Sequence, residues 1–149
     1  MVRLAAAHDA EEVTRLLGAF RDHLGREEPS NASLEASVGR LIGDADTDYL
    51  LAGSPAEGVC QLRYRHCVWL AAGDCTLEDL YVKPGARGSG FGRALVDAAL
   101  ERARERGCAR MVLDTRNTNR AAVALYESVG FSSGSESDGG IDIFMRVRL

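Results

Sequence analysis

The sequence predicts an α/β protein built on one mixed β-sheet with helices on both faces. The chain has 149 residues, which is the size of a single domain with one sizeable core, spanning 1–149. Segments with strand-like patterns interleave with segments of helical apolar spacing, in the order β-α-α-β-β-β-α-β-α-β-β. A glycine-rich turn joins one of these strands directly to a helix, and neither a linker nor an internal repeat divides the chain.

The first part of the chain contributes one short strand and two helices. The strand is expected at 2–6. Asp9 and Glu12 then form an Asp-x-x-Glu variant of the capping box, which predicts the start of a helix. Apolar residues at helical spacing mark this helix at 13–20 and, after a polar loop, a second helix at 34–42.

The remaining elements are strands and helices of ordinary length. Strands are expected at 49–52, 59–70 and 75–82, with a helix at 91–103, a strand at 111–114, a helix at 119–129, a short strand from Phe131 and a last strand at 141–147. Gly73-Asp74 is predicted to be the hairpin turn between the second and third of these strands. Gly107 is expected to end the helix that begins at 91.

Composition favours a soluble globular protein over several other classes. Hydrophobic residues make up 46% and charged residues 27% of the chain, an ordinary globular composition. The net charge is 18 − 22 = −4, which argues against a nucleic-acid partner and is compatible with a cationic ligand. The apolar runs are too short to span a membrane, and the N-terminus lacks the long apolar run of a signal peptide. A cytoplasmic location is therefore expected, and a homodimer is left open as an oligomeric state.

The cysteines and histidines do not predict a metal site. The four cysteines show no CxxC or CxxH spacing, so reduced, structural thiols are expected: Cys60, Cys67, Cys75 and Cys108. The three histidines are scattered along the chain: His8, His23 and His66. Of these, His23 is close to the loop between the first two helices and is a candidate to line an acceptor site.

The most informative segment is the turn between the strand at 75–82 and the helix at 91–103. Its residues are rich in glycine and open directly onto the helix. The first amides of a helix have no partner within it, and the helix dipole adds partial positive charge there. Glycines let the backbone come close to an anion, so the turn suits a phosphate or pyrophosphate. A merely tight turn is the alternative, and the glycines alone do not decide between the two.

Spacing excludes two common phosphate-binding motifs. A Walker A loop ends in Gly-Lys-Ser/Thr, whereas here Gly92 is followed by Arg93. A dinucleotide fingerprint requires G-x-G-x-x-G, and Gly92 comes one residue too early after Gly88 and Gly90. Asp114 ends the next predicted strand, where a ribose-binding acid would stand, but the failed glycine spacing argues against that role. A nicotinamide-dependent oxidoreductase is accordingly a distant alternative.

Two motifs resemble those of the GNAT superfamily of N-acetyltransferases. The first is Arg-x-x-Gly-x-Gly at 87–92, after a Leu-x-Val strand end, and is similar to the family's acetyl-CoA-binding motif. The second lies at 119–131 and is similar to the family's Asn followed by Leu-Tyr-x-x-x-Gly-Phe. Their separation is usual for the family. The resemblance is close over 76–131 and rests on element order alone before that.

The resemblance implies a fold and a cofactor. The fold is the single-domain GNAT fold, with a mixed, mostly antiparallel twisted sheet of six to seven strands and four helices. Acetyl-CoA is the implied cosubstrate, and no metal is implied. The residues assigned to it are Leu80, Tyr81 and Val82, whose backbone would face the pantetheine arm; Arg87, beside the phosphates; Gly88, Ser89, Gly90, Phe91, Gly92 and Arg93, whose amides would face the pyrophosphate; and Asn119 and Tyr126.

Asn119 and Tyr126 also have expectations from the residues themselves. Asn119 is placed to cap the helix at 119–129 through its side chain, and the resemblance adds a contact to CoA. Asn117 is a weaker candidate in the same loop. The resemblance makes Tyr126 the proton donor to the leaving thiolate, since the matching family tyrosine points at the cofactor sulfur. A core tyrosine with a satisfied hydroxyl is the alternative.

Glu78 is the candidate general base, acting directly or through a water molecule. Strand alternation predicts Glu78, Leu80 and Val82 on one face and Leu77, Asp79 and Tyr81 on the other. Two adjacent carboxylates on a mostly apolar strand are costly unless they are solvated or used, although an exposed edge would also explain them. The run Leu-Glu-Asp-Leu-Tyr-Val resembles that of diamine and polyamine acetyltransferases, in which the Glu position faces the amine. Asp79 is the lesser candidate and is expected to anchor local structure.

The acceptor is predicted to be a small cationic primary amine, such as a polyamine, a diamine or an aminoglycoside. In the family the acceptor lies between the first two helices and the last hairpin. These regions carry an acidic set, most of which is expected to be solvated surface: Asp22, Glu27, Glu28, Glu35, Asp44, Asp46, Glu136 and Asp138. A protein N-terminal or lysine acetyltransferase is the alternative enzyme, and a non-catalytic CoA-binding or sensing module is the alternative of another class.

Overall fold

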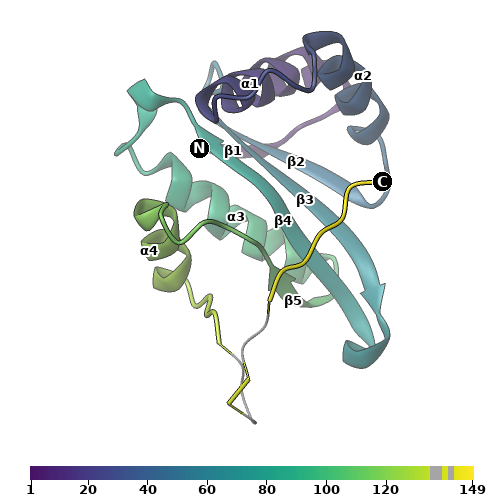
Figure 1. The fold of residues 1–149 in the computed structure, drawn as a ribbon. Helices are drawn as coiled ribbons and strands as arrows, with labels where there is room; N and C mark the ends of the chain where they lie inside the picture. Colours follow the sequence, from purple (N-terminus) through teal and green to yellow (C-terminus); the bar gives the residue numbers. More distant parts are fainter. Residues whose placement is uncertain (135–138, 141–142) are drawn as a thin grey trace. The chain divides into compact units, whose positions relative to one another are not determined.

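The computed structural model of the chain describes residues 1–134, 139–140 and 143–149. The chain divides into two compact units, Met1–Leu113 and Asp114–Leu149, and each is described by itself. The first unit contains β1 (Val2–Leu4), α1 (Ala10–His23), α2 (Asn31–Leu41), β2 (Thr47–Ala52), β3 (Gly58–Cys67), β4 (Ala72–Val82), α3 (Phe91–Glu105) and β5 (Cys108–Val112), and the second contains α4 (Arg120–Ser128) (Figure 1). Short 3₁₀ turns lie at Ala7–Asp9, Val68–Leu70 and Pro84–Ala86.

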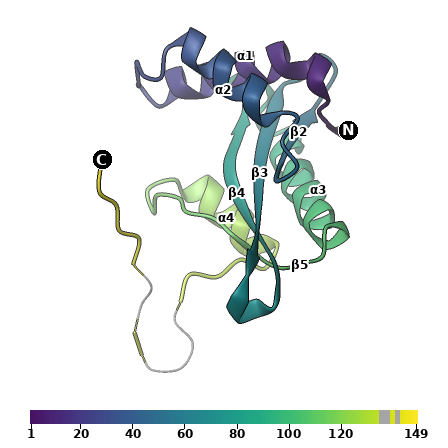
Figure 2. The same ribbon diagram turned by 90° about the vertical axis from the view of Figure 1, so that its right-hand side faces the viewer.

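The sheet of the first unit has five strands in the order β1-β2-β3-β4-β5. Its pairings are antiparallel except for β4 and β5, which are parallel, so the predicted mixed and mostly antiparallel sheet is confirmed. Helices α1 and α2 cover one face of the sheet and α3 covers the other (Figures 1 and 2). Among the described residues, no helix has both the length and the apolar character needed to cross a bilayer.

The prediction of six to seven strands was wrong for the described chain. Phe131 does not begin a strand; its amide donates to the carbonyl of Tyr126 at 3.1 Å and closes the end of α4. The described part of the last predicted strand, 143–147, is irregular, and Ile143 and Val147 are largely exposed. The Ser- and Gly-rich residues that precede it have low strand propensity and fix no register. Ile141 lies outside the described residues.

Both faces of the sheet carry apolar layers. Under α1 and α2 the core includes Val13, Leu16, Val38, Tyr49, Leu51, Val59 and Tyr81. On the other face, α3 buries Leu95, Val96 and Ala99 completely. The close approach of α3 depends on Gly58, since a Cβ there would lie 3.0 Å from the Leu95 side chain and 3.2 Å from the carbonyl oxygen of Tyr81.

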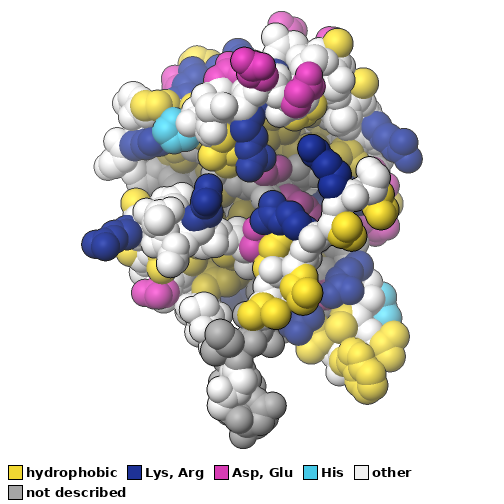
Figure 3. Space-filling view, viewed as in Figure 1, with side chains coloured by type: hydrophobic (Ala, Val, Ile, Leu, Met, Phe, Trp, Pro, Cys, Tyr) yellow, Lys and Arg dark blue, Asp and Glu magenta, His cyan; other side chains and the backbone are white. Residues whose placement is uncertain are grey.

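The β3–β4 hairpin turns earlier than predicted. Its tip is at 68–71, where Ala71 takes the left-handed conformation with φ of 49°, and Cys67 pairs with Ala72. Gly73 lies within β4 and serves a different purpose, because a Cβ there would meet the Cys108 Sγ at 3.0 Å and block β5. The tip exposes Val68 and Trp69, which form the hydrophobic patch at the lower right of Figure 3.

Two buried carboxylates bind the strands to one another and to α3. Asp74 on β4 is 1% exposed and accepts hydrogen bonds from Arg65 of β3 and Arg110 of β5, both at 2.8 Å. The two guanidinium groups lower the pKa of Asp74, so the carboxylate stays charged. Asp48 on β2 accepts from the Tyr64 hydroxyl at 2.9 Å and from Arg102 of α3 at 2.8 Å. Pairing makes the burial of these charges tolerable.

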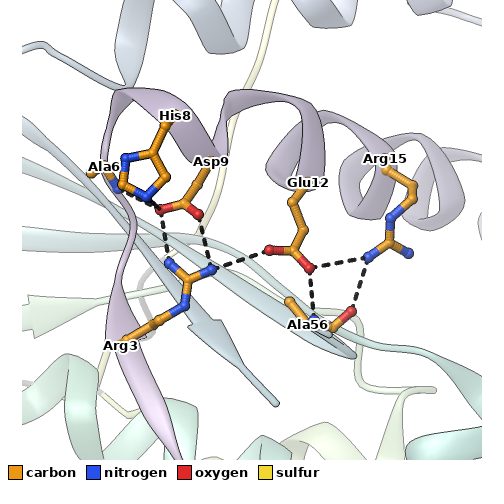
Figure 4. A network of polar contacts seen from close by, with 7 residues as sticks. All are labelled: Arg3, Ala6, His8, Asp9, Glu12, Arg15 and Ala56. Atoms are coloured by element: carbon orange, nitrogen blue, oxygen red, sulfur yellow. Dashed lines mark hydrogen bonds and ion pairs between the residues drawn. The ribbon is translucent and has the colours of Figure 1, made fainter. Parts of the chain in front are cut away.

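A third polar network fixes the start of α1, although not as the predicted capping box (Figure 4). The Asp9 carboxylate accepts from the Ala6 amide at 2.8 Å and from Arg3 at 2.7 Å and 2.9 Å, and makes no cap bond to α1 itself. Glu12 accepts from the backbone amide of Ala56 at 2.7 Å, in the β2–β3 turn. Arg15 donates to the carbonyl of the same residue at 3.0 Å. Side chains of α1 thus bind both polar backbone groups of Ala56.

The ion pair between Arg3 and Asp9 should make stability depend on acid pH. Arg3 and the Ala6 amide lower the pKa of Asp9 from 3.8 to about 2. The pair therefore stabilises the fold fully above about pH 4, and this contribution is lost as the pH falls through about 2. We expect Asp9→Asn to reduce the free energy of unfolding by about 1 kcal/mol at pH 7, since Arg3 is partly exposed, and by much less at pH 2.

Urea denaturation of both proteins at the two pH values measures this difference. Glu11→Gln is the matched control, because Glu11 is an exposed acid in the same helical turn and makes no ion pair with another described residue. An equal loss at both pH values would show that the charge of Asp9 does not matter.

Candidate active site

The strand pairing of β4 changes at Thr76. Up to this residue β4 is paired with β3 on one side and with β5 on the other. From 77 to 82 it pairs only with β3, and no described strand covers its other side. The N–H and C=O groups along that side can bind an extended, amide-containing ligand in the way that an added strand would bind. Leu80, Tyr81 and Val82 lie in this segment, as the sequence predicts.

At the end of β4 the glycine-rich turn prepares the start of α3 for an anion. Gly88 and Gly90 have φ of +82° and +88°, a conformation that strongly favours glycine. The first hydrogen bond of the helix runs from the Ala94 amide to the Gly90 carbonyl at 2.9 Å. The amides of Phe91, Gly92 and Arg93 therefore have no partner within the helix.

Helix α3 differs from α1 and α2 in the side chains at its start. No described side chain hydrogen-bonds its first amides or balances the partial positive charge there. The first turn of α1 carries Glu11 and Glu12, and α2 is capped by Ser30, whose hydroxyl accepts from the Ser33 amide. In the part of the chain that the structure describes, α3 has neither an acidic residue in its first turn nor a capping side chain. Its positive end is thus left for an external anion.

Arg87 is held beside this turn by two contacts. Its Nε donates to the carbonyl oxygen of Val82 at 3.0 Å, and its Nη2 lies 3.1 Å from Nε2 of His23. Because a guanidinium group only donates hydrogen bonds, Nε2 of His23 is the acceptor in this contact. His23, at the end of α1, also packs on Tyr81 with ring centroids 6.0 Å apart. His23 therefore lies beside the glycine-rich turn.

An irregularity in β4 changes the predicted faces of its side chains. Gln61 pairs with Asp79 and the next residue, Leu62, pairs with Leu77, so Glu78 is an extra residue without a partner in the register. Such a bulge shifts the alternation by one position. Leu77 and Tyr81, predicted on one face, consequently lie on opposite faces.

The contacts of neighbouring side chains establish the two faces. Tyr81 stacks on Phe20 of α1 with ring centroids 5.2 Å apart, so it lies on the face of α1 and α2. Leu77 follows Cys75 by two residues, and Cys75 pairs with Tyr64. The ring of Tyr64 lies 4.0 Å from the guanidinium of Arg106, which follows α3. Leu77 therefore lies on the face of α3.

A cavity of about 280 Å³ lies between the sheet and the two helices that cover this face. Residues of β2, β3 and β4 form its sheet wall: Tyr49, Gln61 and Asp79. Residues 24–29, which connect α1 and α2, form part of the opposite wall. Apolar side chains of the helices complete it: Leu17, Phe20, Leu34, Val38 and Leu41. Polar and charged residues make up the rest of the lining, and a small cavity with such a mixed lining is compatible with a small-molecule site.

Asp79 places its charge at this cavity, whereas Glu78 is exposed and does not line it. Burial, together with the nearby Asp79 carboxylate, raises the pKa of Tyr49 to about 12, against an opposing effect of Arg63. Tyr49 therefore remains a neutral donor and acceptor at neutral pH. The sheet wall offers one carboxylate, one hydroxyl and one amide, which together suit an ammonium group.

The second unit carries the other two predicted site residues. Asn119 caps α4, since its side-chain oxygen accepts from the Ala122 amide at 3.3 Å, which confirms the capping prediction. Tyr126 is 8% exposed, and its ring meets that of Phe131 edge to face at 5.7 Å.

The buried cysteines are not suited to act as nucleophiles. The cysteines are free thiols, as expected, and burial raises the pKa of Cys60 and, to about 12, that of Cys75. A buried thiol of this kind is a poor nucleophile. Among the described residues, no group of three or more His, Cys, Asp or Glu side chains could hold a metal ion.

Sequence reasoning did not predict Tyr49, Gln61 and Arg26 as cavity residues, and it named Asp79, which lines the cavity, only as the lesser candidate base. The available signal was Gln61, a polar residue in the middle of an apolar strand. Of the acidic set expected near the acceptor, only Glu28 lines the cavity. Asp22 instead pairs with Arg21, and the Asp44 carboxylate accepts from the Thr47 hydroxyl. Glu136 and Asp138 lie outside the described residues.

Comparison with known proteins agrees with this geometry. Residues 14–131 match the model of the Acetyltransferase (GNAT) family. The streptothricin acetyltransferase of Streptomyces lavendulae is 30% identical over 89% of this chain and 70% of its own length. The thialysine N-epsilon-acetyltransferase of Bos taurus is 26% identical over 93% of this chain and 88% of its own length.

Solved structures give the same fold. A protein of Arthrobacter sp. FB24 named as an acetyltransferase superposes with a TM-score of 0.91 at 30% identity, covering 100% of this chain and 96% of the other. An aminoglycoside acetyltransferase from an uncultured soil metagenomic sample superposes with a TM-score of 0.78, covering 99% and 96% of the two chains. At 14% identity, this second likeness concerns the fold alone.

The glycine-rich turn yields a test that needs no ligand. A Cβ at Gly90 would meet no atom within 4 Å, so the cost of Gly90→Ala comes from the backbone alone. At φ of +88° we expect a loss of about 1 kcal/mol in the free energy of unfolding. Gly85→Ala is the control, because Gly85 is equally open and lacks a positive φ. Chemical denaturation measures both, and equal effects would rule out backbone strain at Gly90.

Proposed function

Since the chain belongs to the GNAT acetyltransferase family and is an acyltransferase, we propose that it moves an acetyl group from acetyl-CoA directly to a small-molecule primary amine. The observation that carries the proposal is the continuous path along β4. The edge of β4 at 77–82, which no described strand covers, leads into the start of α3, where three amides have no partner within the helix and Arg87 is held nearby. A pantetheine arm followed by a pyrophosphate has the chemistry to fill this path.

The proposed cofactor contacts follow from these positions. The backbone of Leu80, Tyr81 and Val82 would hydrogen-bond the amides of the pantetheine arm. The turn from Gly88 to Arg93 would hold the pyrophosphate with its amides, and the guanidinium of Arg87 would lie near the phosphates. Asn119 would contribute a contact to CoA in addition to its capping role.

The proposed reaction is a direct transfer. The amine nitrogen attacks the thioester carbon, a C–N bond forms and the C–S bond breaks. An ammonium substrate loses two protons in reaching the amide; one goes to the leaving thiolate and one to solvent. We assign the first transfer to Tyr126 as donor and the second to Glu78 as base, directly or through water. Asp79, at the cavity, is the second carboxylate that could accept a proton.

The proposed acceptor is a small cationic amine. Two of the relatives are named as acetyltransferases of streptothricin and of thialysine. The small cavity with Asp79 in its sheet wall supports a compact amine more than a protein terminus or a protein lysine. A protein acceptor remains the alternative enzyme activity.

A CoA-release assay on the purified protein tests the proposal. Thiol formation from acetyl-CoA is measured with polyamines, diamines, amino sugars, amino acids and peptides. We expect amine-dependent release with at least one class of small amine and weaker release with peptides. CoA binding without release for any amine would favour a non-catalytic CoA-binding module. Release with peptides alone would favour the protein acetyltransferase.

The role of Tyr126 is tested by Tyr126→Phe. Loss of a proton donor that acts in the transition state should lower kcat by about 100-fold and leave CoA affinity almost unchanged. Steady-state kinetics give kcat and the KM for acetyl-CoA, and calorimetry gives the CoA dissociation constant as a control. A raised KM with unchanged kcat would make Tyr126 a binding residue instead.

A further inference from the structure

The cationic side chains around the glycine-rich turn differ in the partners that they have. Lys83 precedes the turn and pairs with Glu57 at 3.0 Å. Arg93 lies in the first turn of α3 and pairs with Asp97 at 2.9 Å. Arg87, within the turn, has no carboxylate partner among the described residues. It is therefore the cation of this region whose charge no described side chain balances.

The contacts of Arg87 leave most of its hydrogen-bonding capacity free. A guanidinium group has five N–H donors in a fixed, planar arrangement. Nε uses its donor on the carbonyl oxygen of Val82, and Nη2 uses one on Nε2 of His23. Three donors remain, among them one on each Nη atom at the end of the group. Such a parallel pair matches two oxygens of a phosphate group.

His23 is itself held in place, although it is exposed. It is the last residue of α1, and its ring packs on that of Tyr81 with centroids 6.0 Å apart. Tyr81 is 5% exposed and stacks on Phe20, which lies one turn earlier in α1. The imidazole thus relates the position of the Arg87 guanidinium to the packed end of α1.

We propose that His23 is the positioning residue for Arg87, and that the guanidinium held in this way binds the pyrophosphate of CoA. This inference rests on the proposed function. The pyrophosphate is chosen over the other phosphate of CoA because Arg87 and the amides proposed to bind the pyrophosphate belong to the same turn. His23 lies outside that turn and acts on the cofactor only through Arg87.

The type of acceptor that His23 supplies is the physical reason for this role. A long side chain that is fixed before the ligand arrives loses less conformational entropy on binding. A carboxylate at this position would also fix Arg87, but it would compete with the phosphate for the positive charge. A ring nitrogen that accepts a hydrogen bond fixes the guanidinium without adding a negative charge.

Two substitutions of His23, with calorimetry of CoA binding, test the proposal. His23→Phe keeps a ring on Tyr81 but removes the acceptor, and should raise the CoA dissociation constant about fivefold. His23→Gln restores an acceptor at about the same reach and should stay within about twofold of the parent protein. His66→Phe is the matched control, since His66 is an exposed histidine at the opposite end of the β3–β4 pair and should leave binding unchanged. Thermal melts check that each variant folds.

A double-mutant cycle with Arg87→Gln shows whether His23 acts through Arg87. In the Arg87→Gln background, His23→Phe should cause no further loss of CoA affinity. Dephospho-CoA, which lacks the 3′-phosphate, should show the same fivefold effect of His23→Phe as CoA does. In steady-state kinetics this variant should raise the KM for acetyl-CoA and leave kcat unchanged, because the pyrophosphate is remote from the reacting thioester.

Several outcomes would overturn the inference. An unchanged CoA affinity of His23→Phe would do so, as would an equal loss in His23→Gln. A full further loss in the Arg87→Gln background would show that His23 contacts the cofactor directly, and loss of the effect with dephospho-CoA would exclude the pyrophosphate. If the parent protein does not bind CoA, the proposed function fails instead. Calorimetry with inorganic pyrophosphate then decides the inference separately: binding that His23→Phe weakens supports it, and no binding rejects it.

Discussion

The loss of one neighbour by β4 at Thr76 is the constraint on which the proposed cofactor site depends. A strand inside a sheet normally has both of its edges paired, and the part of β4 before this residue obeys that rule between β3 and β5. Beyond it, β4 pairs with β3 alone, and no described strand pairs with the backbone donors and acceptors along its other side. The glycine-rich turn then directs the chain into α3, so a strand edge and a helix start succeed each other along one path.

The bulge at Glu78 determines on which face of the sheet the following side chains of β4 lie. Without the extra residue, Asp79 and Tyr81 would share the face of Leu77 and would be directed toward α3. With it, Tyr81 packs on α1 and the Asp79 carboxylate reaches the cavity on the same side. A single inserted residue therefore determines which carboxylate lies at the cavity and which is left exposed. This is a typical use of a bulge near an active site.

Most of the element order followed from the sequence, because apolar spacing and capping residues act locally. The helix at 91–103 and the Asn119 cap are examples. Side-chain facing at Asp79 could not be predicted, since one unpaired residue reverses the alternation and leaves no mark in the pattern. The hairpin tip was misplaced because Gly73 looks like a turn residue, whereas it permits the close approach of Cys108. The last predicted strand, of which the described part is irregular, could form only by pairing with another strand. Ser- and Gly-rich residues before it do not specify such a pairing.

Helix α1 contacts both the glycine-rich turn proposed to bind the cofactor and the cavity, and all three lie in the first unit. Its first turn is fixed by Asp9 and Glu12, which bind Arg3 and the backbone of Ala56. Because this end is held, the position of the other end is determined as well. That end brings His23 against Arg87 and begins the connection that lines the cavity. Residues 24–29 are exposed, so substitutions among them can alter the cavity while the contacts that orient Arg87 remain the same.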